Sequence, residues 1–208
     1  MMSAPSLFLG AWMTEHERAR RARDMRVRAR PAVRRWLASA AVGDFSAATV
    51  LHDGGRKALV AARGAQSGEE LFRFTGVLQR GNHPFALQVG TAAYLVCHAE
   101  PQPWCYLDHS FSPSVRLQHA PVASVDAVPP TLTATAAVDL APGDFLTIDY
   151  TLHEWDMDRE GFVCAESGRR VRGFRHLAEA EQDAALPFAL PHVKQLHLQH
   201  LFGQSSRC

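Results

Sequence analysis

The stretch "YLDHSFSPSV", Tyr106 to Val115, decides the fold that this sequence predicts. Its Asp-His-Ser core is followed by an aromatic residue, a serine and a proline, which is typical of a tight polar loop between apolar strands. Such a loop either reverses the chain or forms the wall of a binding site. The segments on either side of it bear on this choice.

Short apolar segments surround the loop, and turn residues separate them from one another. They comprise residues 48–52, 57–63, 70–78, 85–89, 92–97, 132–140 and 145–150. None of them is followed by a long amphipathic helix, which argues against a doubly wound parallel sheet. The pattern predicts a mainly β fold with flanking helices.

Four segments occur in the order and approximate spacing of the SET-domain family of AdoMet-dependent methyltransferases, which the chain resembles over roughly residues 45–175. They are "GGRKALVAARG", "GEELFRFTGVL", "YLDHSFSPSV" and "LAPGDFLTIDYT". The resemblance implies a SET-domain-like fold of several small curved sheets with a pseudoknotted C-terminus. It also implies S-adenosylmethionine as the cofactor, and methyl transfer to an amine as the reaction.

The resemblance assigns cofactor binding to Gly55, Lys57, Asp108 and His109. Lys57 departs from the pattern, because the family has a second glycine there, where the backbone approaches the cofactor. As an alternative, Gly54 and Gly55 simply close a hairpin. Asp108 replaces an asparagine and, when ionised, only accepts hydrogen bonds.

The family's active-site tyrosine corresponds to Tyr150, which ends "FLTIDY". The alternative is an ordinary strand tyrosine with its hydroxyl at the surface. A phenol near the methyl group and the amine would orient both, which makes Tyr150 the predicted catalytic residue. The predicted substrate pocket is aromatic and consists of Phe74, Tyr94, Tyr106 and Phe111.

The segment "FVCAESGRRVRGFRHL" resembles the cysteine-rich tail of many SET enzymes, but only Cys164 remains and Glu166 stands at the second cysteine position. A zinc site of thiolates cannot be assembled from it. We therefore expect a divergent member of bacterial type, whose tail is anchored by Phe162 and Phe174. His197 and His200 lack a carboxylate in helical register, so we expect no metal.

The 208 residues, 47% of them hydrophobic, are enough for one substantial core. We expect a basic helical arm over residues 1–31, a SET-like domain over residues 32–175 and a helical C-terminal segment over residues 176–208, with helices at 177–186 and 193–201. Residues 1–35 hold nine arginines against three acidic residues. Without basic and aromatic residues interleaved after this arm, a nucleic-acid partner is not favoured.

The cysteine spacing shows no CxxC pair, which favours reduced thiols and a cytoplasmic location. No apolar run is long enough to span a membrane, so no membrane partner is expected. The acceptor is either a protein lysine or a small molecule. Two further hypotheses stay open. One is a repurposed biosynthetic enzyme that uses the same pocket for a small molecule, either as a methyl acceptor or in a non-methylating reaction such as a cyclisation; the other is a catalytically silent binding module.

Overall fold

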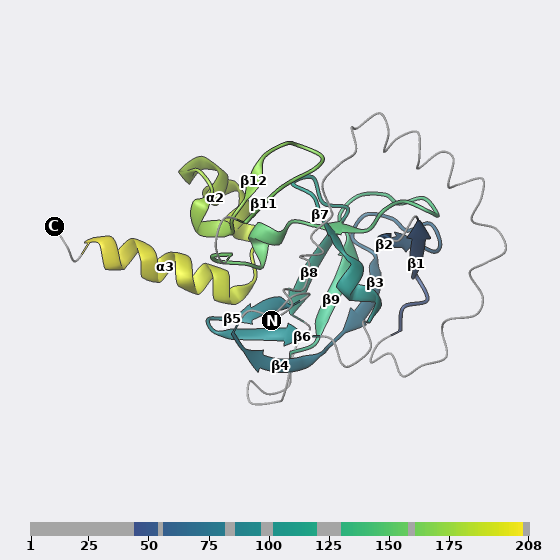
Figure 1. The fold of residues 1–208 in the computed structure, drawn as a ribbon, viewed down its shortest axis with the longest axis horizontal. Helices are drawn as coiled ribbons and strands as arrows, with labels where there is room; N and C mark the ends of the chain where they lie inside the picture. Colours follow the sequence, from purple (N-terminus) through teal and green to yellow (C-terminus); the bar gives the residue numbers. More distant parts are fainter. Residues whose placement is uncertain are drawn as a thin grey trace, which may run out of the picture.

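A computed structural model describes residues 44–53, 56–81, 86–96, 102–119, 130–157 and 161–205 (Figure 1). The predicted arm over residues 1–31, the predicted domain start at residue 32 and the predicted cofactor residue Gly55 all lie outside the described residues. The described part of the chain consists mainly of short strands, with helices towards the C-terminus.

The strands form five small sheets. They are β1 (Ala48–Asp53), β2 (Arg56–Ala61), β3 (Glu70–Phe74), β4 (Val77–Arg80), β5 (Leu87–Gly90), β6 (Ala93–Val96), β7 (Asp108–His109), β8 (Val115–His119), β9 (Leu132–Ala136), β10 (Thr147–Ile148), β11 (Phe162–Val163) and β12 (Arg170–Val171). The sheets are ordered β1-β2, β3-β9-β8, β4-β6-β5, β10-β7 and β11-β12. The predicted class, mainly β in several small sheets with flanking helices, is confirmed. Residues 70–78, expected as one segment, form two strands that belong to different sheets.

The central sheet follows the two-residue period of a half-buried strand. In β9, Leu132, Ala134 and Ala136 are buried and the threonines between them are half-buried. In β8, Val115 and Leu117 are buried in the same alternating way. One face of this sheet therefore covers the core.

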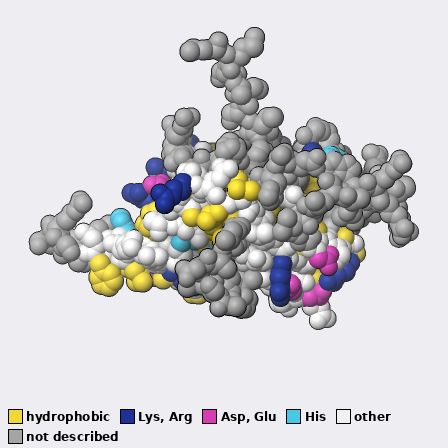
Figure 2. All heavy atoms as spheres, turned by 90° about the horizontal axis from the view of Figure 1, so that it is seen from below, with side chains coloured by type: hydrophobic (Ala, Val, Ile, Leu, Met, Phe, Trp, Pro, Cys, Tyr) yellow, Lys and Arg dark blue, Asp and Glu magenta, His cyan; other side chains and the backbone are white. Residues whose placement is uncertain are grey.

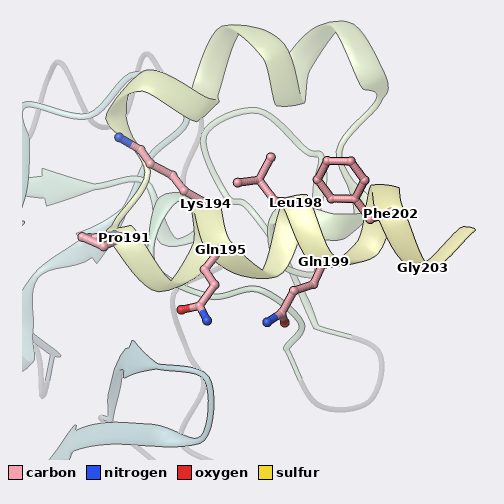
Figure 3. A pocket seen from close by; sticks show the side chains of 7 residues that line it. All are labelled: Pro191, Lys194, Gln195, Leu198, Gln199, Phe202 and Gly203. Carbon is pink, nitrogen blue, oxygen red and sulfur yellow. The ribbon is translucent and has the colours of Figure 1, made fainter. Parts of the chain in front are cut away.

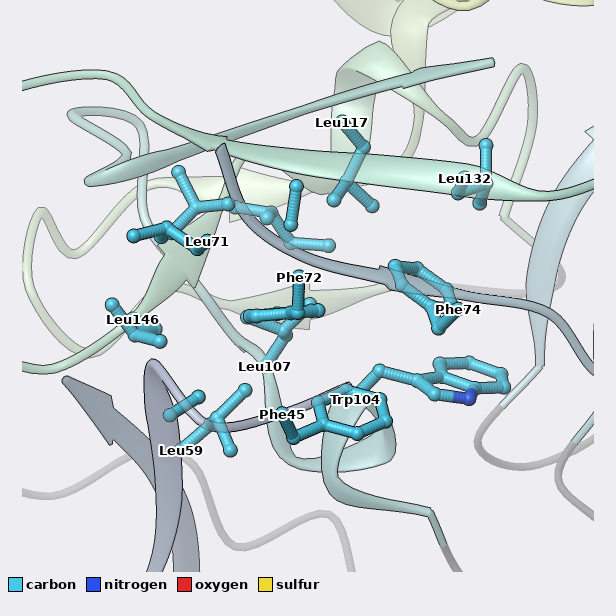
Figure 4. Close-up of a cluster of buried hydrophobic side chains, with 14 of the residues drawn as sticks. Phe45, Leu59, Leu71, Phe72, Phe74, Trp104, Leu107, Leu117, Leu132 and Leu146 are labelled. Carbon is cyan, nitrogen blue, oxygen red and sulfur yellow. The ribbon is translucent and has the colours of Figure 1, made fainter. Parts of the chain in front are cut away.

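A row of aromatic rings fills that core (Figure 4). The ring centroids of Phe45 and Phe72 are 4.9 Å apart, and Phe74 stacks on Trp104 at 4.9 Å. Trp104 belongs to η2 (Pro103–Tyr106), a 3-10 turn that directly precedes β7. The core thus fixes the start of the segment that the sequence singled out.

The C-terminal part is helical, as predicted. It contains η4 (Phe174–His176), α2 (Glu179–Ala185), η5 (Leu186–Phe188) and α3 (Pro191–Ser205). A second apolar cluster of Leu152, Phe174, Ala189 and Val193 joins these helices to the segment after β10. Phe174 therefore anchors the tail through this second cluster and not through the main core. Its ring stacks on that of Trp155, with the ring centroids 6.1 Å apart.

The pairing of β7 with β10 is parallel, although most of the small sheets are antiparallel. Asp108 lies opposite Thr147, and His109 lies opposite Ile148. After β8 and β9 have formed the central sheet, the chain returns to lie beside β7. Such a return is what a pseudoknotted C-terminus requires.

One expectation about the cysteines is wrong. Cys105, on η2, is disulfide-bonded, whereas Cys164 is a free buried thiol. Sequence spacing did not reveal this bond, because the two cysteines of a disulfide meet through the fold and need no local motif. In the described part of the chain, no helix has both the length and the apolar character needed to cross a membrane.

Candidate functional site

The parallel pair brings Tyr150 beside His109. The Ser110 backbone N–H donates to the Ile148 carbonyl oxygen at 3.0 Å, which extends the β7–β10 ladder. β10 then leads into η3 (Tyr150–Leu152), a 3-10 turn that begins at Tyr150. The ring centroids of His109 and Tyr150 are 5.2 Å apart. Residues predicted from two distant segments thus meet at one place.

His109 is a neutral imidazole with a defined tautomer. Its side chain is 3% exposed, and its Nδ1 lies 3.1 Å from the Tyr150 backbone nitrogen. The backbone N–H can only donate, so Nδ1 is the acceptor and the ring proton is on Nε2. Burial, with a smaller contribution from the positive charge of Arg169, lowers the pKa of His109 to about 4. Nε2 is buried and has no hydrogen-bond partner among the described residues.

Asp149 does not form an ion pair with His109, although its Oδ1 is 3.9 Å from Nδ1. The same Oδ1 accepts hydrogen bonds from the Thr151 backbone N–H at 2.9 Å and from the Thr151 hydroxyl at 2.8 Å. Burial raises the pKa of Asp149, while the Thr151 hydrogen bonds counteract part of this effect. Because His109 is uncharged at neutral pH, the role of Asp149 is to cap η3.

The Tyr150 phenol is held from the side of β7. Its hydroxyl donates to the Leu107 carbonyl oxygen at 2.7 Å. The residue is half-buried and packs against the main core. Since its proton is directed to Leu107, the phenol oxygen presents lone pairs and can accept a hydrogen bond from an amine.

The β11–β12 hairpin lies over this pair of rings. Phe162 places its ring centroid 5.5 Å from that of His109 and 5.8 Å from that of Tyr150. From the turn of the hairpin, Glu166 accepts a hydrogen bond from the Ser110 hydroxyl at 2.5 Å. The prediction that Phe162 anchors the tail is thus confirmed. Glu166 also joins the tail to the loop after β7.

Arg169 links the loop after β7 to α2. Its guanidinium carbon is 4.3 Å from the ring centroid of Phe111, whose ring meets His109 edge-on at 4.6 Å. One of its nitrogens donates to Glu181 at 2.5 Å. Sequence patterns did not single out Arg169, because its contact is with the ring of Phe111, which is distant in the chain and is brought beside it only by the fold.

Two glycines of the hairpin allow a matched test of how tightly it is packed. Gly161 and Gly168 both have positive φ, 63° and 69°. A Cβ at Gly161 would be 1.9 Å from the Val171 carbonyl oxygen, whereas one at Gly168 would meet nothing within 4 Å. We expect Gly161→Ala to lower the free energy of unfolding by about 3 kcal/mol or more, and Gly168→Ala by about 1 kcal/mol. Urea unfolding measures both, and equal losses would contradict the packing described here.

The other predicted residues lie on β2, β3, β6 and η2. Lys57 is exposed, with its Nζ 3.3 Å from the Tyr106 hydroxyl and 5.3 Å from the Tyr106 ring centroid. Phe74 is 1% exposed and lies in the core, so it presents no open surface to a substrate. Tyr94 is half-buried on β6, opposite Gln79 and Gln88. Phe111, the fourth predicted pocket residue, contacts the ring of His109.

A buried polar network that the sequence did not indicate supports the chain after Tyr150. The carboxylate of Glu154 accepts from the Gln88 backbone N–H at 2.9 Å, and the Gln88 side-chain oxygen accepts from the Trp155 backbone N–H at 2.9 Å. Gln88 is 3% exposed and Glu154 is 7% exposed. These bonds tie β5 to the segment that follows η3, since buried polar groups are stable only when they are paired.

The residues around His109 fit an adenosyl cofactor in their chemistry. The buried Nε2–H of His109 is a hydrogen-bond donor, and it lies on the other side of the ring from the Nδ1 that binds the Tyr150 backbone. Asp108 adds a half-buried carboxylate, and Phe111 and Phe162 add aromatic surface. A planar base with ring nitrogens can stack on such rings and accept from such a donor. Phe111 and Phe162 already contact His109, so a ligand there would displace part of the aromatic packing.

A shallow groove lies elsewhere, on α3 (Figure 3), and its lining comprises Pro191, Lys194, Gln195, Leu198, Gln199, Phe202 and Gly203. Phe202 is 70% exposed and Leu198 is 51% exposed. Figure 2 shows hydrophobic side chains at the end of the molecule that α3 forms. None of the predicted site residues lines this groove.

Comparison with known proteins gives similarities in structure only. No protein-family model matches the sequence, and no curated protein matches it. One similar solved structure is KRYPTONITE in complex with mCHH DNA, an H3(1–15) peptide and SAH, with a TM-score of 0.42 and 17% identity; the match covers 49% of this chain and 22% of that one. Another is a candidate histone methyltransferase of Plasmodium falciparum, with a TM-score of 0.40, 15% identity and coverage of 50% and 91%. Neither likeness says what this chain binds.

Proposed function

We propose that this chain is a SET-domain-like enzyme that transfers a methyl group from S-adenosylmethionine to an amine, on a protein lysine or a small molecule. The observation that carries the proposal is the parallel pairing of β7 with β10, because it brings Asp108 and His109 to the predicted catalytic residue Tyr150. The motif order of the sequence supports the same assignment.

The cofactor would supply an electrophilic methyl group on a sulfonium. Asp108 and His109 would hold it, the first through its carboxylate and the second through its Nε2–H. The negative charge of this carboxylate would be electrostatically favourable for a bound sulfonium. Phe111 and Phe162 would exclude water from the reacting centre.

Tyr150 would orient the acceptor. An amine attacks only in its neutral form, and a lysine of pKa about 10.4 is neutral roughly once in 10³ at pH 7, which costs about 4–5 kcal/mol. The Tyr150 oxygen, whose proton is directed to Leu107, accepts a hydrogen bond from the amine and aligns its lone pair with the methyl group. The nitrogen–methyl bond would form as the sulfur–methyl bond breaks and leaves a neutral thioether, and the surplus proton of the ammonium form would leave to bulk water.

Calorimetric titration with S-adenosylmethionine tests the proposal. We expect saturable binding, and we expect Asp108→Ala to weaken it at least tenfold, because the carboxylate is lost. Asp183→Ala removes an exposed carboxylate from α2 and serves as the matched control, with unchanged affinity expected. Absence of heat at millimolar cofactor would exclude methyl transfer and leave the repurposed enzyme or the silent binding module.

A further inference from the structure

Leu107 and His109, which are two residues apart in the chain, hold Tyr150 through its hydroxyl and through its backbone N–H. The Leu107 carbonyl oxygen accepts from the phenol at 2.7 Å, and the His109 Nδ1 accepts from the backbone N–H at 3.1 Å. The His109 ring also meets the Tyr150 ring edge-on at 5.2 Å. A change in the position of His109 is therefore transmitted to the whole of Tyr150.

The backbone N–H of Tyr150 needs an acceptor from outside its own turn. Tyr150 is the first residue of η3, and the first N–H groups of a helical turn have no partner within it. The usual capping group is the side chain before the turn, but Asp149 is engaged with the Thr151 N–H and hydroxyl. The Nδ1 of His109 therefore accepts the hydrogen bond from the Tyr150 backbone N–H in place of the Asp149 side chain.

We propose that His109, besides facing the cofactor, is a positioning residue for Tyr150, and that its Nδ1 sets the direction of the phenol through the Tyr150 backbone N–H. This inference rests on the proposed function for its effect on turnover. Its structural part does not, because the hydrogen bond exists whatever the ligand is. Displacement of a reacting group by about 1 Å can cost 100-fold in rate.

Two substitutions test the roles of the two His109 ring nitrogens separately. His109→Asn places an amide oxygen close to the position of Nδ1, so it keeps the acceptor and removes the Nε2–H. His109→Gln places its amide closer to the position of Nε2, so it removes the acceptor and keeps a donor. Each variant retains a polar side chain in the same pocket, which makes them matched controls for each other.

We expect His109→Gln to lower kcat at least tenfold with KM for the cofactor within threefold, and His109→Asn to keep kcat within threefold while KM rises. In parallel, hydrogen exchange of the Tyr150 amide accelerates at least tenfold in His109→Gln and stays close to wild type in His109→Asn. A merely structural role would change both variants alike. Equal kcat and equal exchange in the two variants would overturn the proposal.

The two readouts distinguish the possible failures. If the wild-type protein transfers no methyl group, the proposed function fails, and the exchange of the Tyr150 amide still decides whether His109 positions Tyr150. If His109→Gln does not fold, His109→Asn decides alone. In that case a tenfold loss of kcat, or faster exchange despite the retained acceptor, would overturn the positioning role, and wild-type kcat and exchange would support it.

Discussion

Replacement of Tyr150 with phenylalanine is expected to lower kcat for methyl transfer at least 100-fold while the Kd for S-adenosylmethionine stays within threefold. The lost hydroxyl would act in the transition state, and a 100-fold loss corresponds to about 3 kcal/mol. Steady-state kinetics and calorimetry measure the two quantities. The split between kcat and Kd is what a residue that orients the acceptor produces, whereas a cofactor ligand would change Kd.

A matched control accounts for the structural cost of this substitution. Tyr150→Phe also removes the hydrogen bond to the Leu107 carbonyl oxygen, which is worth about 1 kcal/mol of stability. Thr75→Val likewise removes a half-buried hydroxyl that donates to a carbonyl oxygen, that of Pro130 at 3.2 Å, and it does so away from Tyr150. We expect a similar loss of stability with kcat retained. Wild-type kcat in Tyr150→Phe would remove Tyr150 from the mechanism.

Acid is expected to unfold the protein between about pH 4.5 and 5.5. Burial is the main reason that the pKa of His109 and of His192 lies at about 4 and that of His153 at about 3; the nearby His192, His109 and His119 contribute to the lowering at His153. The unfolded chain therefore binds more protons below about pH 6.5, so stability falls as the pH drops towards 4. Three such histidines together cost roughly 3–4 kcal/mol per pH unit. A domain holds roughly 5–15 kcal/mol in total.

His192→Gln identifies the source of this acid sensitivity. The His192 ring donates through Nε2 to the His153 carbonyl oxygen at 2.8 Å, and a glutamine amide can donate to the same oxygen without titrating. We expect the acid midpoint, followed by circular dichroism, to move down by about half a pH unit. His200→Gln changes an exposed histidine of the same helix and should leave the midpoint in place. A common midpoint for both variants would show that other groups govern the acid transition.

Local sequence patterns predicted most of the strands and the C-terminal helices. Alternation of buried residues in β9 and the helical spacing of Val193, Leu196 and Leu201 are properties of neighbouring residues, so they are visible in the sequence. The two-residue strands β7 and β10 carry no such period. The expectation that these two segments lie together came from the resemblance in motif order and not from the strand propensity of their residues. The assignments of domain boundaries, bacterial origin and cytoplasmic location stay predictions.

The parts of the site that the sequence did not reveal are contacts between distant segments. Phe74 has the type expected of a pocket residue, yet its stacking on Trp104 draws it into the core. Glu166 looked like the loss of a zinc ligand, and in the structure its carboxylate bonds to Ser110. A substitution pattern read along the chain tells which ligand is missing, but only the fold shows what replaces it.

Only two residue pairs join β7 to β10, so this junction is expected to open more readily than the larger sheets around it. A compound that touches residues on both sides of the junction stabilises its closed form, and it slows local opening by a factor that grows with its concentration over its Kd. The Ser110 amide, which donates to Ile148 across the junction, reports that opening through its hydrogen exchange. This single amide therefore offers a screen for the natural ligand that needs no assumption about its chemistry.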